Sequence, residues 1–405
     1  MTGVQTCALP ISVLWHYPSL DTRSVDQPAP AHETMMSAAT FPLTTPILKP
    51  QVTYLGLVES DTSVIIVNYN GRPHLERCLT SLRESQTEGY EIILIDNAST
   101  DDSVAYVAQT FPEVHIISSP VNGGFGQGNN AGVCQTQSRY LIFLNPDTEV
   151  TPGWATALIA ALEANPQVGL VTSKILLMQT PKQINTCGNV IHTTGLTLCR
   201  GMGMPRQHYA RHETVNAISG AAFAMRRELF EALGGFDEIF FLYMEDTDLS
   251  LRARLAGYQC LYVPDSVVYH DYQLTFGPQK TFYQERNRYL MLLKALKWPT
   301  FLVLLPALLL AEGITWGFAL LNDRAHLGNK PRAYAWIIEH WQSIMERRQQ
   351  VQALRRVRDQ DLLREHAYKL DFEQVHSGML THLAGVVFSL LFWLLHRLAL
   401  TLVWW

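Results

Sequence analysis

Three acids crowd the start of one predicted helix. The segment FFLYMEDTDLSLRARLAGY (240–258) brings Glu245, Asp246 and Asp248 together just before an apolar helical stripe. Acids at a helix N-terminus are stabilised by about 0.3–1 kcal/mol each, so capping accounts for one or two of them. The aromatic residues that precede them would partly desolvate the group, and crowded carboxylates with a raised pKa are suited to act as general bases. This segment is therefore a candidate catalytic site.

A second candidate site combines an aspartate with a distant histidine. Asn145-Pro146-Asp147 follows an apolar run, and His270 closes another. Magnesium or manganese at a substrate pyrophosphate takes only one or two carboxylates plus phosphate oxygens, so Asp147 could suffice. Two alternatives stay open: an Asp after Pro often bonds its own backbone in a turn, and a lone His is more often a hydrogen-bonded structural residue.

The loop NGGFGQGNNAG (122–132) is rich in glycine, which lets a backbone approach a ligand closely. It also matches a dinucleotide fingerprint at Gly126-x-Gly128-x-x-Ala131, with Asp147 at the position of the ribose-binding acid. Against that interpretation, the loop follows the third predicted strand and not the first. A glycine-rich turn without a ligand is the remaining alternative.

Apolar runs and helical stripes alternate through the first half of the chain. The runs 63–70, 91–96, 114–118 and 140–145 predict strands, and the stripes between them predict helices, one opening at Pro73 and the next capped by Ser99 or Thr100. Strands this apolar indicate a parallel sheet covered on both faces, with ligands at the carboxyl ends of its strands. The second half is predicted to add helices at 154–164 and 246–256 and a strand at 260–270.

Composition excludes several classes of protein. Hydrophobic residues make up 47% of the 405 residues, and the net charge of −5 provides no basic field to hold nucleic acid. The six cysteines have neither disulfide-framework nor zinc spacing.

Residues 1–60 are rich in proline and are predicted to be a disordered leader, whose opening (1–12) looks like a translated sequencing adapter.

Taken in order, six segments resemble the bacterial family 2 glycosyltransferases, and within them the rhamnosyltransferase-like members. The segments are SVIIVNYNG, IDNASTDDS, NGGFGQGNNAG, LNPDTEV, the long block SGAAF…LAGY and VYH. The resemblance implies an α/β fold of the nucleotide-diphospho-sugar transferase (GT-A) type with a mainly parallel central sheet. It assigns 61–150 to nucleotide binding and 151–290 to acceptor binding.

The resemblance also implies roles for single residues. Asp246 would be the catalytic base, with Gly220 and Glu245 at the acceptor. Asp147 and His270 would hold a divalent metal, Mg²⁺ or Mn²⁺, although Asn145 replaces the first acid of the family's D-x-D motif. The nucleotide part of the donor would be bound by six residues: Tyr69, Asp96, Asn97, Asn122, Gly124 and Asn129.

The implied activity is an inverting, metal-dependent transfer of a sugar such as rhamnose from a nucleotide-diphosphate donor to a glycan or lipid-linked acceptor in cell-envelope polysaccharide synthesis. A dinucleotide-dependent oxidoreductase, a nucleotidyltransferase and a catalytically silent nucleotide-sugar-binding protein remain as alternatives. Cofactor absorbance would reveal the first.

Residues 291–405 are predicted to be a helical, membrane-associated region. Two apolar stretches, 298–321 and 379–405, flank a segment with five arginines between 347 and 358. Because Pro299, Pro306 and Glu312 interrupt the first stretch, we expect an interfacial or re-entrant helix there, and an interfacial or spanning helix at 379–405. The arginines favour the cytoplasmic face of the cell membrane.

Overall fold

The structure is a computed structural model that describes residues 60–85, 89–272, 279–322, 324–370 and 379–405, all within one compact unit. Apart from residue 60, the predicted leader lies outside the described residues.

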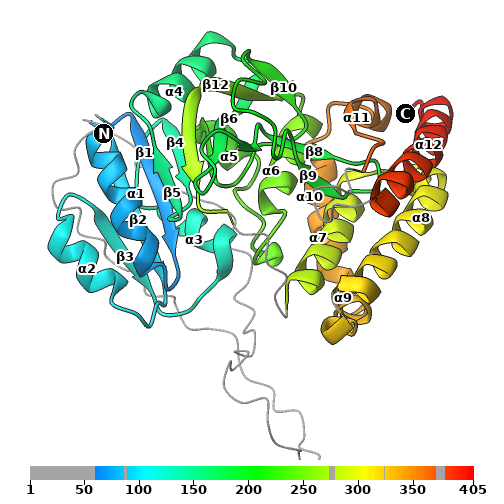
Figure 1. The fold of residues 1–405 in the computed structure, drawn as a ribbon, viewed down its shortest axis with the longest axis horizontal. Helices are drawn as coiled ribbons and strands as arrows, with labels where there is room; N and C mark the ends of the chain where they lie inside the picture. Colours follow the sequence, from blue (N-terminus) through cyan, green and yellow to red (C-terminus); the bar gives the residue numbers. More distant parts are fainter. Residues whose placement is uncertain (1–59, 86–88, 273–278, 323, 371–378) are drawn as a thin grey trace, which may run out of the picture. The chain divides into compact units, whose positions relative to one another are not determined.

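A mixed sheet forms the centre of the molecule (Figure 1). Its strand order is β10-β12-β6-β11-β4-β1-β2-β3, with β5 paired to β12 and β7 to β6, and a separate hairpin joins β8 and β9. Only β10 and β11 along this order run against the other strands. The mainly parallel α/β sheet predicted from the sequence is therefore confirmed.

The five strands with predicted ranges, β1, β2, β3, β4 and β12, lie close to their predicted positions, and seven further strands in the described residues complete the sheets. They are β1 (Thr62–Asn68), β2 (Glu91–Asn97), β3 (His115–Ser119), β4 (Tyr140–Leu144), β5 (Thr148–Val150), β6 (Val168–Leu177), β7 (Ile184–Thr186), β8 (Asn189–Ile191), β9 (Thr197–Cys199), β10 (Glu213–Val215), β11 (Ala222–Arg226) and β12 (Gln259–His270). The central strands are buried on both faces, which explains why their sequences are apolar throughout instead of alternating.

Helices cover the sheet on both sides. The first six are α1 (Arg72–Glu84), α2 (Ser103–Thr110), α3 (Gly124–Val133), α4 (Trp154–Ala164), α5 (Arg227–Ala232) and α6 (Glu245–Leu255), with a short 3-10 helix η1 (Glu238–Phe240) before α6. The predicted stripe of α1 is buried as expected, at Leu75, Cys78, Leu79 and Leu82.

The predicted cap of α2 is wrong. This helix begins at Ser103, whose backbone N–H donates to Asp101 Oδ1 at 3.1 Å. Ser99 and Thr100 have other partners: the Ser99 hydroxyl accepts from the N–H of Asn70, and the Thr100 N–H donates to Asn70 Oδ1. These two residues therefore tie the end of β2 to the end of β1 instead of opening a helix.

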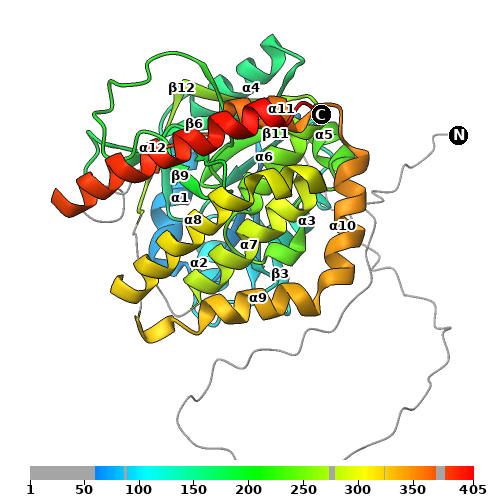
Figure 2. The same cartoon turned by 90° about the vertical axis from the view of Figure 1, so that its right-hand side faces the viewer.

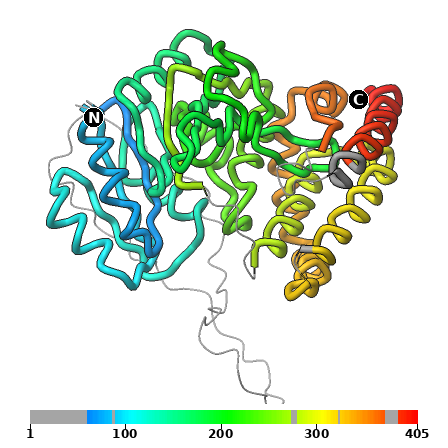
Figure 3. The backbone as a smooth tube through the Cα atoms, in the orientation of Figure 1, coloured from blue at the N-terminus to red at the C-terminus, as the bar shows by residue number. Residues whose placement is uncertain are grey.

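The C-terminal helices share a core with the catalytic half. They are α7 (Lys280–Ala295), α8 (Trp298–Asn322), α9 (Asn329–Glu339), α10 (Trp341–Ala353), α11 (Asp359–Glu365) and α12 (Met379–Leu402). Buried residues from η1, from α6 and from all six of these helices form one apolar cluster. Figure 2 shows α8, α9 and α12 lying across one face, and Figure 3 shows the end of the chain returning beside α8. The boundary predicted at residue 290 falls inside α7.

Candidate functional site

Strand pairing brings Asp147 and His270 together. Asp147 lies in the turn between β4 and β5, and β5 pairs with the end of β12 so that Thr148 is opposite His270. His270 Nε2 is 3.3 Å from Asp147 Oδ2, and the Asp271 N–H donates to the Asp147 carbonyl at 2.9 Å. Two residues that are far apart in the sequence thus form one polar site at the end of the sheet.

The unsatisfied polar atoms of this site fit a bound cation. Asp147 Oδ1 and Asn145 Oδ1 are buried and have no hydrogen-bond partner among the described residues. His270 Nδ1 is 2.9 Å from Asn185 Oδ1. Because an amide oxygen only accepts hydrogen bonds, Nδ1 carries the hydrogen, and the lone pair of Nε2 faces Asp147. Two facing acceptors need a proton or a cation between them.

The charge of this site is set by its neighbours. Burial would raise the pKa of Asp147, but a protonated His270 outweighs it through its hydrogen bond and charge, so in that state this pKa lies below its usual range. No group of three or more His, Cys, Asp or Glu side chains suited to a metal occurs in the described part of the chain. A cation here would therefore need further oxygens from a bound ligand.

Asp246 is held at the first turn of α6 by backbone donors. Its Oδ2 accepts from the Gly220 N–H at 2.8 Å, and its Oδ1 accepts from the Thr247 N–H at 2.6 Å. Asn189 Nδ2 lies 3.4 Å from the same Oδ2. Burial raises the pKa of Asp246, although these donors oppose the rise. The side chain is only half-buried, so one acid of the cluster is both fixed and reachable.

The other two acids of the cluster are buried and differ from each other. Burial, together with the charges of Asp246 and Asp248, raises the pKa of Glu245 to about 8, and its Oε2 has no partner among the described residues. Asp248 pairs with Arg252 at 2.8 Å and with Lys294 at 2.8 Å. Asp248 is thus a structural ion, while Glu245 is a buried acid beside Asp246.

Short backbone steps connect the two candidate sites. The Asn145 N–H donates to the Ala221 carbonyl at 3.0 Å, where β4 meets β11. The preceding residue, Gly220, donates to Asp246. A Cβ added at Gly220 would lie 3.4 Å from the Asp246 carboxylate, so glycine allows the close approach. The geometry therefore brings Asp147, His270 and Asp246 to one end of the sheet.

The residues predicted to bind the nucleotide follow the first three strands: Tyr69 comes after β1, Asp96 and Asn97 end β2, Asn122 comes after β3, and Gly124 and Asn129 lie in α3. Tyr69 is 52% exposed and free to stack on a planar group. Asp96 is buried and accepts from Asn68 Nδ2 at 3.0 Å and from the Ser99 N–H at 3.0 Å. Asn97 donates to the Gly124 carbonyl at 2.9 Å. The structure thus gives Asp96 and Asn97 a part in holding the loops, and their contact with a donor stays a prediction.

Most glycines of the loop 122–132 serve helix packing. A Cβ at Gly128 would lie 2.7 Å from Val67, and one at Gly132 would lie 2.5 Å from Ile65. Gly124 has a positive φ of 82°, and its added Cβ would lie 2.1 Å from the Phe241 carbonyl. Both glycines of the dinucleotide-like pattern are explained by packing: Gly128 lies against Val67 of β1, and a Cβ added at Gly126 would lie 3.1 Å from Phe236.

The two asparagines predicted in this loop have local partners. Asn122 Oδ1 accepts from the Gly124 N–H at 2.9 Å, which shapes the turn before α3. Asn129 is almost completely buried and donates to the Phe125 carbonyl at 3.0 Å. The sequence contains no local pattern that identifies three further asparagines as part of the site. Asn185, Asn189 and Asn287 contact distant segments.

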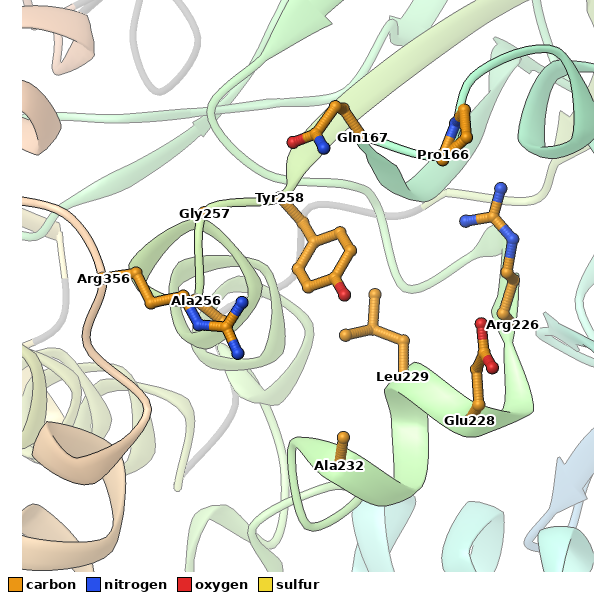
Figure 4. A pocket seen from close by; sticks show the side chains of 10 residues that line it. All are labelled: Pro166, Gln167, Arg226, Glu228, Leu229, Ala232, Ala256, Gly257, Tyr258 and Arg356. Carbon is orange, nitrogen blue, oxygen red and sulfur yellow. The ribbon is translucent and has the colours of Figure 1, made fainter.

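A cavity elsewhere does not belong to this site. It has a volume of about 700 Å³, and Tyr258 and Leu229 point into it (Figure 4). Its lining includes the residues just before β6 and β12 and the end of α6. It therefore lies at the amino ends of those two strands, opposite to Asp147, His270 and Asp246.

A mainly parallel sheet with an acidic site at the carboxyl ends of its strands is the arrangement expected of a GT-A type fold. The family model for glycosyl transferase family 2 matches residues 63–234. An N-acetylglucosaminyl-diphospho-decaprenol L-rhamnosyltransferase of Mycobacterium tuberculosis is 30% identical over an alignment of 233 residues that covers 51% of this chain and 75% of that protein. The chain belongs to glycosyltransferase family 2, as its sequence segments had suggested, and the oxidoreductase alternative is dropped.

Two further similarities concern one sequence and one structure. Rhamnosyltransferase WbbL of Escherichia coli is 25% identical over 242 residues, covering 56% of this chain and 88% of that protein. Staphylococcus aureus TarS 1-349 in complex with UDP-GlcNAc has a TM-score of 0.49 at 17% identity, covering 83% of this chain and 90% of that one.

Proposed function

We propose that this glycosyltransferase moves a sugar, with rhamnose the first to test, from a nucleotide-diphosphate donor to a hydroxyl of a lipid-linked glycan in cell-envelope synthesis. The names of the two rhamnosyltransferase relatives support rhamnose as the transferred sugar, and the name of the mycobacterial one supports a lipid-linked acceptor. The observation that carries the proposal is the convergence of Asp147, His270 and Asp246 at the carboxyl ends of the strands.

In this reaction Asp246 acts as the general base. It takes the proton of the acceptor hydroxyl, whose oxygen attacks the anomeric carbon while the bond to the diphosphate breaks and the diphosphate leaves with the electron pair. A single displacement inverts the anomeric centre. The Gly220 and Thr247 N–H groups orient the carboxylate, and burial, which favours the protonated form, raises its affinity for the proton.

Asp147 and His270 are the residues that would hold a divalent metal, with Asn145 Oδ1 beside them. When bound, such a cation neutralises the charge that develops on the diphosphate. Asn185 keeps His270 in the tautomer whose Nε2 is free. Asp147 Oδ1, which has no partner among the described residues, supplies the hard oxygen that Mg²⁺ and Mn²⁺ prefer.

Metal-linked binding of the donor tests this assignment. We expect Mn²⁺ to strengthen the binding of UDP or dTDP to the wild type, and Asp147→Asn and His270→Gln each to remove about 10- to 100-fold of that gain. Calorimetric titrations with Mn²⁺ and with EDTA measure the difference. Asp271→Asn, a neighbouring acid whose side chain contacts His74, is the matched control and should keep the gain. Equal losses with and without metal would mean that the two residues act structurally.

The C-terminal helices support a place at the membrane surface. Two helical stretches, Trp298–Leu321 and Gly385–Leu402, are long and apolar enough to cross a bilayer, and less than a quarter of each is buried within the protein. On α8, Leu302 and Leu309 are 74% and 62% exposed, and on α12 Leu390 is 59% exposed. Because α8 and α12 pack side by side (Figure 2), their apolar faces form one surface suited to lipid.

Polar contacts of α8 favour an interfacial helix over a crossing. Glu312 bonds to Arg288 and Tyr289 of α7 and to Tyr334 of α9, at 2.6 Å for the last. Lys330 Nζ is 3.2 Å from the same carboxylate. These contacts hold one side of α8 against helices that pack on the catalytic half, so only its other side is available to lipid.

The arginines between 347 and 358 contribute less to lipid binding than the sequence suggested. Arg347 pairs with Asp237 at 2.7 Å, Arg348 donates to backbone carbonyls of α7, and Arg355 pairs with Asp359 at 2.7 Å. These three guanidinium groups are engaged within the protein, which leaves Arg356 and Arg358 exposed. We therefore expect apolar contact to dominate membrane binding.

Flotation with vesicles of phosphatidylglycerol and phosphatidylethanolamine tests the membrane surface. We expect Leu302→Glu combined with Leu390→Glu to move most of the protein from the floated to the soluble fraction, because each change puts a charge where an acyl chain would lie. Met204→Glu, at an exposed apolar residue of the catalytic half, should float like the wild type. A double variant that floats fully would refute the assigned surface.

A further inference from the structure

The loop that precedes α6 has an unusual backbone. Phe241, Tyr243 and Met244 all have positive φ, at 61°, 69° and 69°, although none is glycine. Side chains with a Cβ rarely adopt this conformation, so each of these residues is strained. The residues that follow this loop are Glu245 and Asp246. The conformation persists only if surrounding groups hold it.

Asn287 of α7 holds this loop through its side-chain amide. Its Nδ2 donates to the carbonyls of Phe240, Leu242 and Tyr243 at 3.1, 2.9 and 2.7 Å. An amide has two hydrogens, so at least one is shared between two carbonyls. The side chain is completely buried, which protects these bonds from exchange with water.

Arg286 fixes the orientation of that amide. Its Nε donates to Asn287 Oδ1 at 2.9 Å, so the oxygen is identified and the NH₂ group must face the loop. Its Nη2 donates to the carbonyls of Ile239 and Phe240 at 2.9 and 2.6 Å. Two adjacent residues of α7 therefore satisfy four of the five carbonyls from 239 to 243, all except that of Phe241.

The remaining carbonyl of the loop joins it to the donor side of the site. Phe241 accepts from the Phe125 N–H at 2.9 Å, next to Gly124 at the start of α3. The loop is thus hydrogen-bonded to the glycine-rich segment on one side and to α7 on the other. It leads through Glu245 into Asp246. A shift of the loop would move the carboxylate relative to the donor.

We propose that Asn287, oriented by Arg286, is a positioning residue that sets the left-handed loop 240–244 and through it aligns Asp246 with the donor. This inference rests on the proposed role of Asp246. It assigns to α7, which lies between the catalytic half and the apolar helix α8, an indirect part in catalysis, through the position of Asp246. The expected signature is a loss in the chemical step with donor binding intact, because misplacement by about 1 Å can cost about 100-fold in rate.

Steady-state kinetics of Asn287→Ala and Asn287→Asp test the proposal. The substrates are UDP- and dTDP-linked sugars, including the rhamnosyl donor, with a prenyl-diphosphate-linked N-acetylglucosamine acceptor. We expect kcat to fall about 10- to 100-fold and the Kd of the nucleoside diphosphate to stay within about threefold of wild type. Tyr289→Phe is the matched control, because it removes a hydrogen bond of the same helix that faces Glu312 instead of the loop, and should keep wild-type kcat.

The possible outcomes separate the role of Asn287 from the proposed function. Wild-type kcat in a folded Asn287 variant would overturn the proposal, and so would a loss confined to donor Kd. If the Asn287 variants fail to fold, Arg286→Lys takes their place, since it keeps the charge but loses the planar fork, and the same split in kcat and Kd is required of it. A wild-type protein inactive with every donor would instead refute the proposed function itself.

Discussion

Replacing Asp246 by Asn is expected to lower kcat by about 10²- to 10⁴-fold, the usual range for loss of a general base. An amide keeps the shape of the carboxylate but cannot accept the proton of the acceptor hydroxyl. Because the Kd of the nucleoside diphosphate depends on other residues, it should change little. Rates at saturating donor and acceptor, together with titrations of UDP or dTDP, measure the two effects separately.

The same substitution has a structural cost that needs its own measurement. Both carboxylate oxygens of Asp246 accept backbone N–H bonds, from Gly220 and Thr247, whereas an amide offers only one oxygen. The NH₂ group would then face a donor, so a modest fall in the unfolding temperature is expected. Asp265→Asn makes the same charge change at an exposed site of the same half and should leave both kcat and stability unchanged. Near wild-type turnover of Asp246→Asn would exclude this residue as the base.

The sheet could be predicted because its signal is local. Runs such as SVIIVN and YLIFLN are apolar on both faces, and only a strand buried between two layers requires this. The sequence also located α6 and β12 to within one or two residues. The cap of α2 was missed because Ser99 and Thr100 form hydrogen bonds across to β1, and such a contact depends on which strands are neighbours.

The site was only partly predictable for the same reason. Acids and a histidine stand out by type, so Asp147, Asp246 and His270 were named from the sequence. The approach of His270 to Asp147 depends on the pairing of β5 with β12, and that of Asp246 depends on the pairing of β4 with β11; no local pattern encodes either pairing. Asn185, Asn189 and Asn287 were missed because a buried asparagine is identified only by the distant carbonyls and rings that it contacts. The glycines of α3 are an ambiguous signal, because close packing and the approach of a ligand both favour glycine.

A buried lysine joins the C-terminal helices to the catalytic half. Lys294 of α7 is almost completely buried and pairs with Asp237 at 2.5 Å and with Asp248 of α6 at 2.8 Å. Arg347 of α10 reaches the other oxygen of Asp237 at 2.7 Å. Burial would raise the pKa of Asp237, but the charges of Lys294 and Arg347 outweigh it and lower this pKa from 3.8 to about 2.

Lys294→Met is expected to lower the free energy of unfolding by about 3–5 kcal/mol, because it leaves two buried carboxylates with one cation fewer. Urea unfolding at pH 7 measures the loss. Arg358→Met removes one partner of the exposed pair with Asp361 and should cost less than about 1 kcal/mol. A loss for Lys294→Met no larger than that of the control would mean that Arg347 and Arg252 already neutralise both acids.

The pH dependence of this variant gives an independent check. An unfolded aspartate takes up its proton near 3.8, whereas folded Asp237 stays ionised down to about 2, so its contribution to stability is complete above pH 4 and is lost as pH falls toward 2. Without Lys294 the pKa of Asp237 rises, and the acid unfolding of the variant should begin at a higher pH. Because Lys294 lies beyond residue 290, a chain cut there would lose this cation together with the shared core. We therefore expect the catalytic half to need the C-terminal helices to fold, whatever those helices do at a membrane.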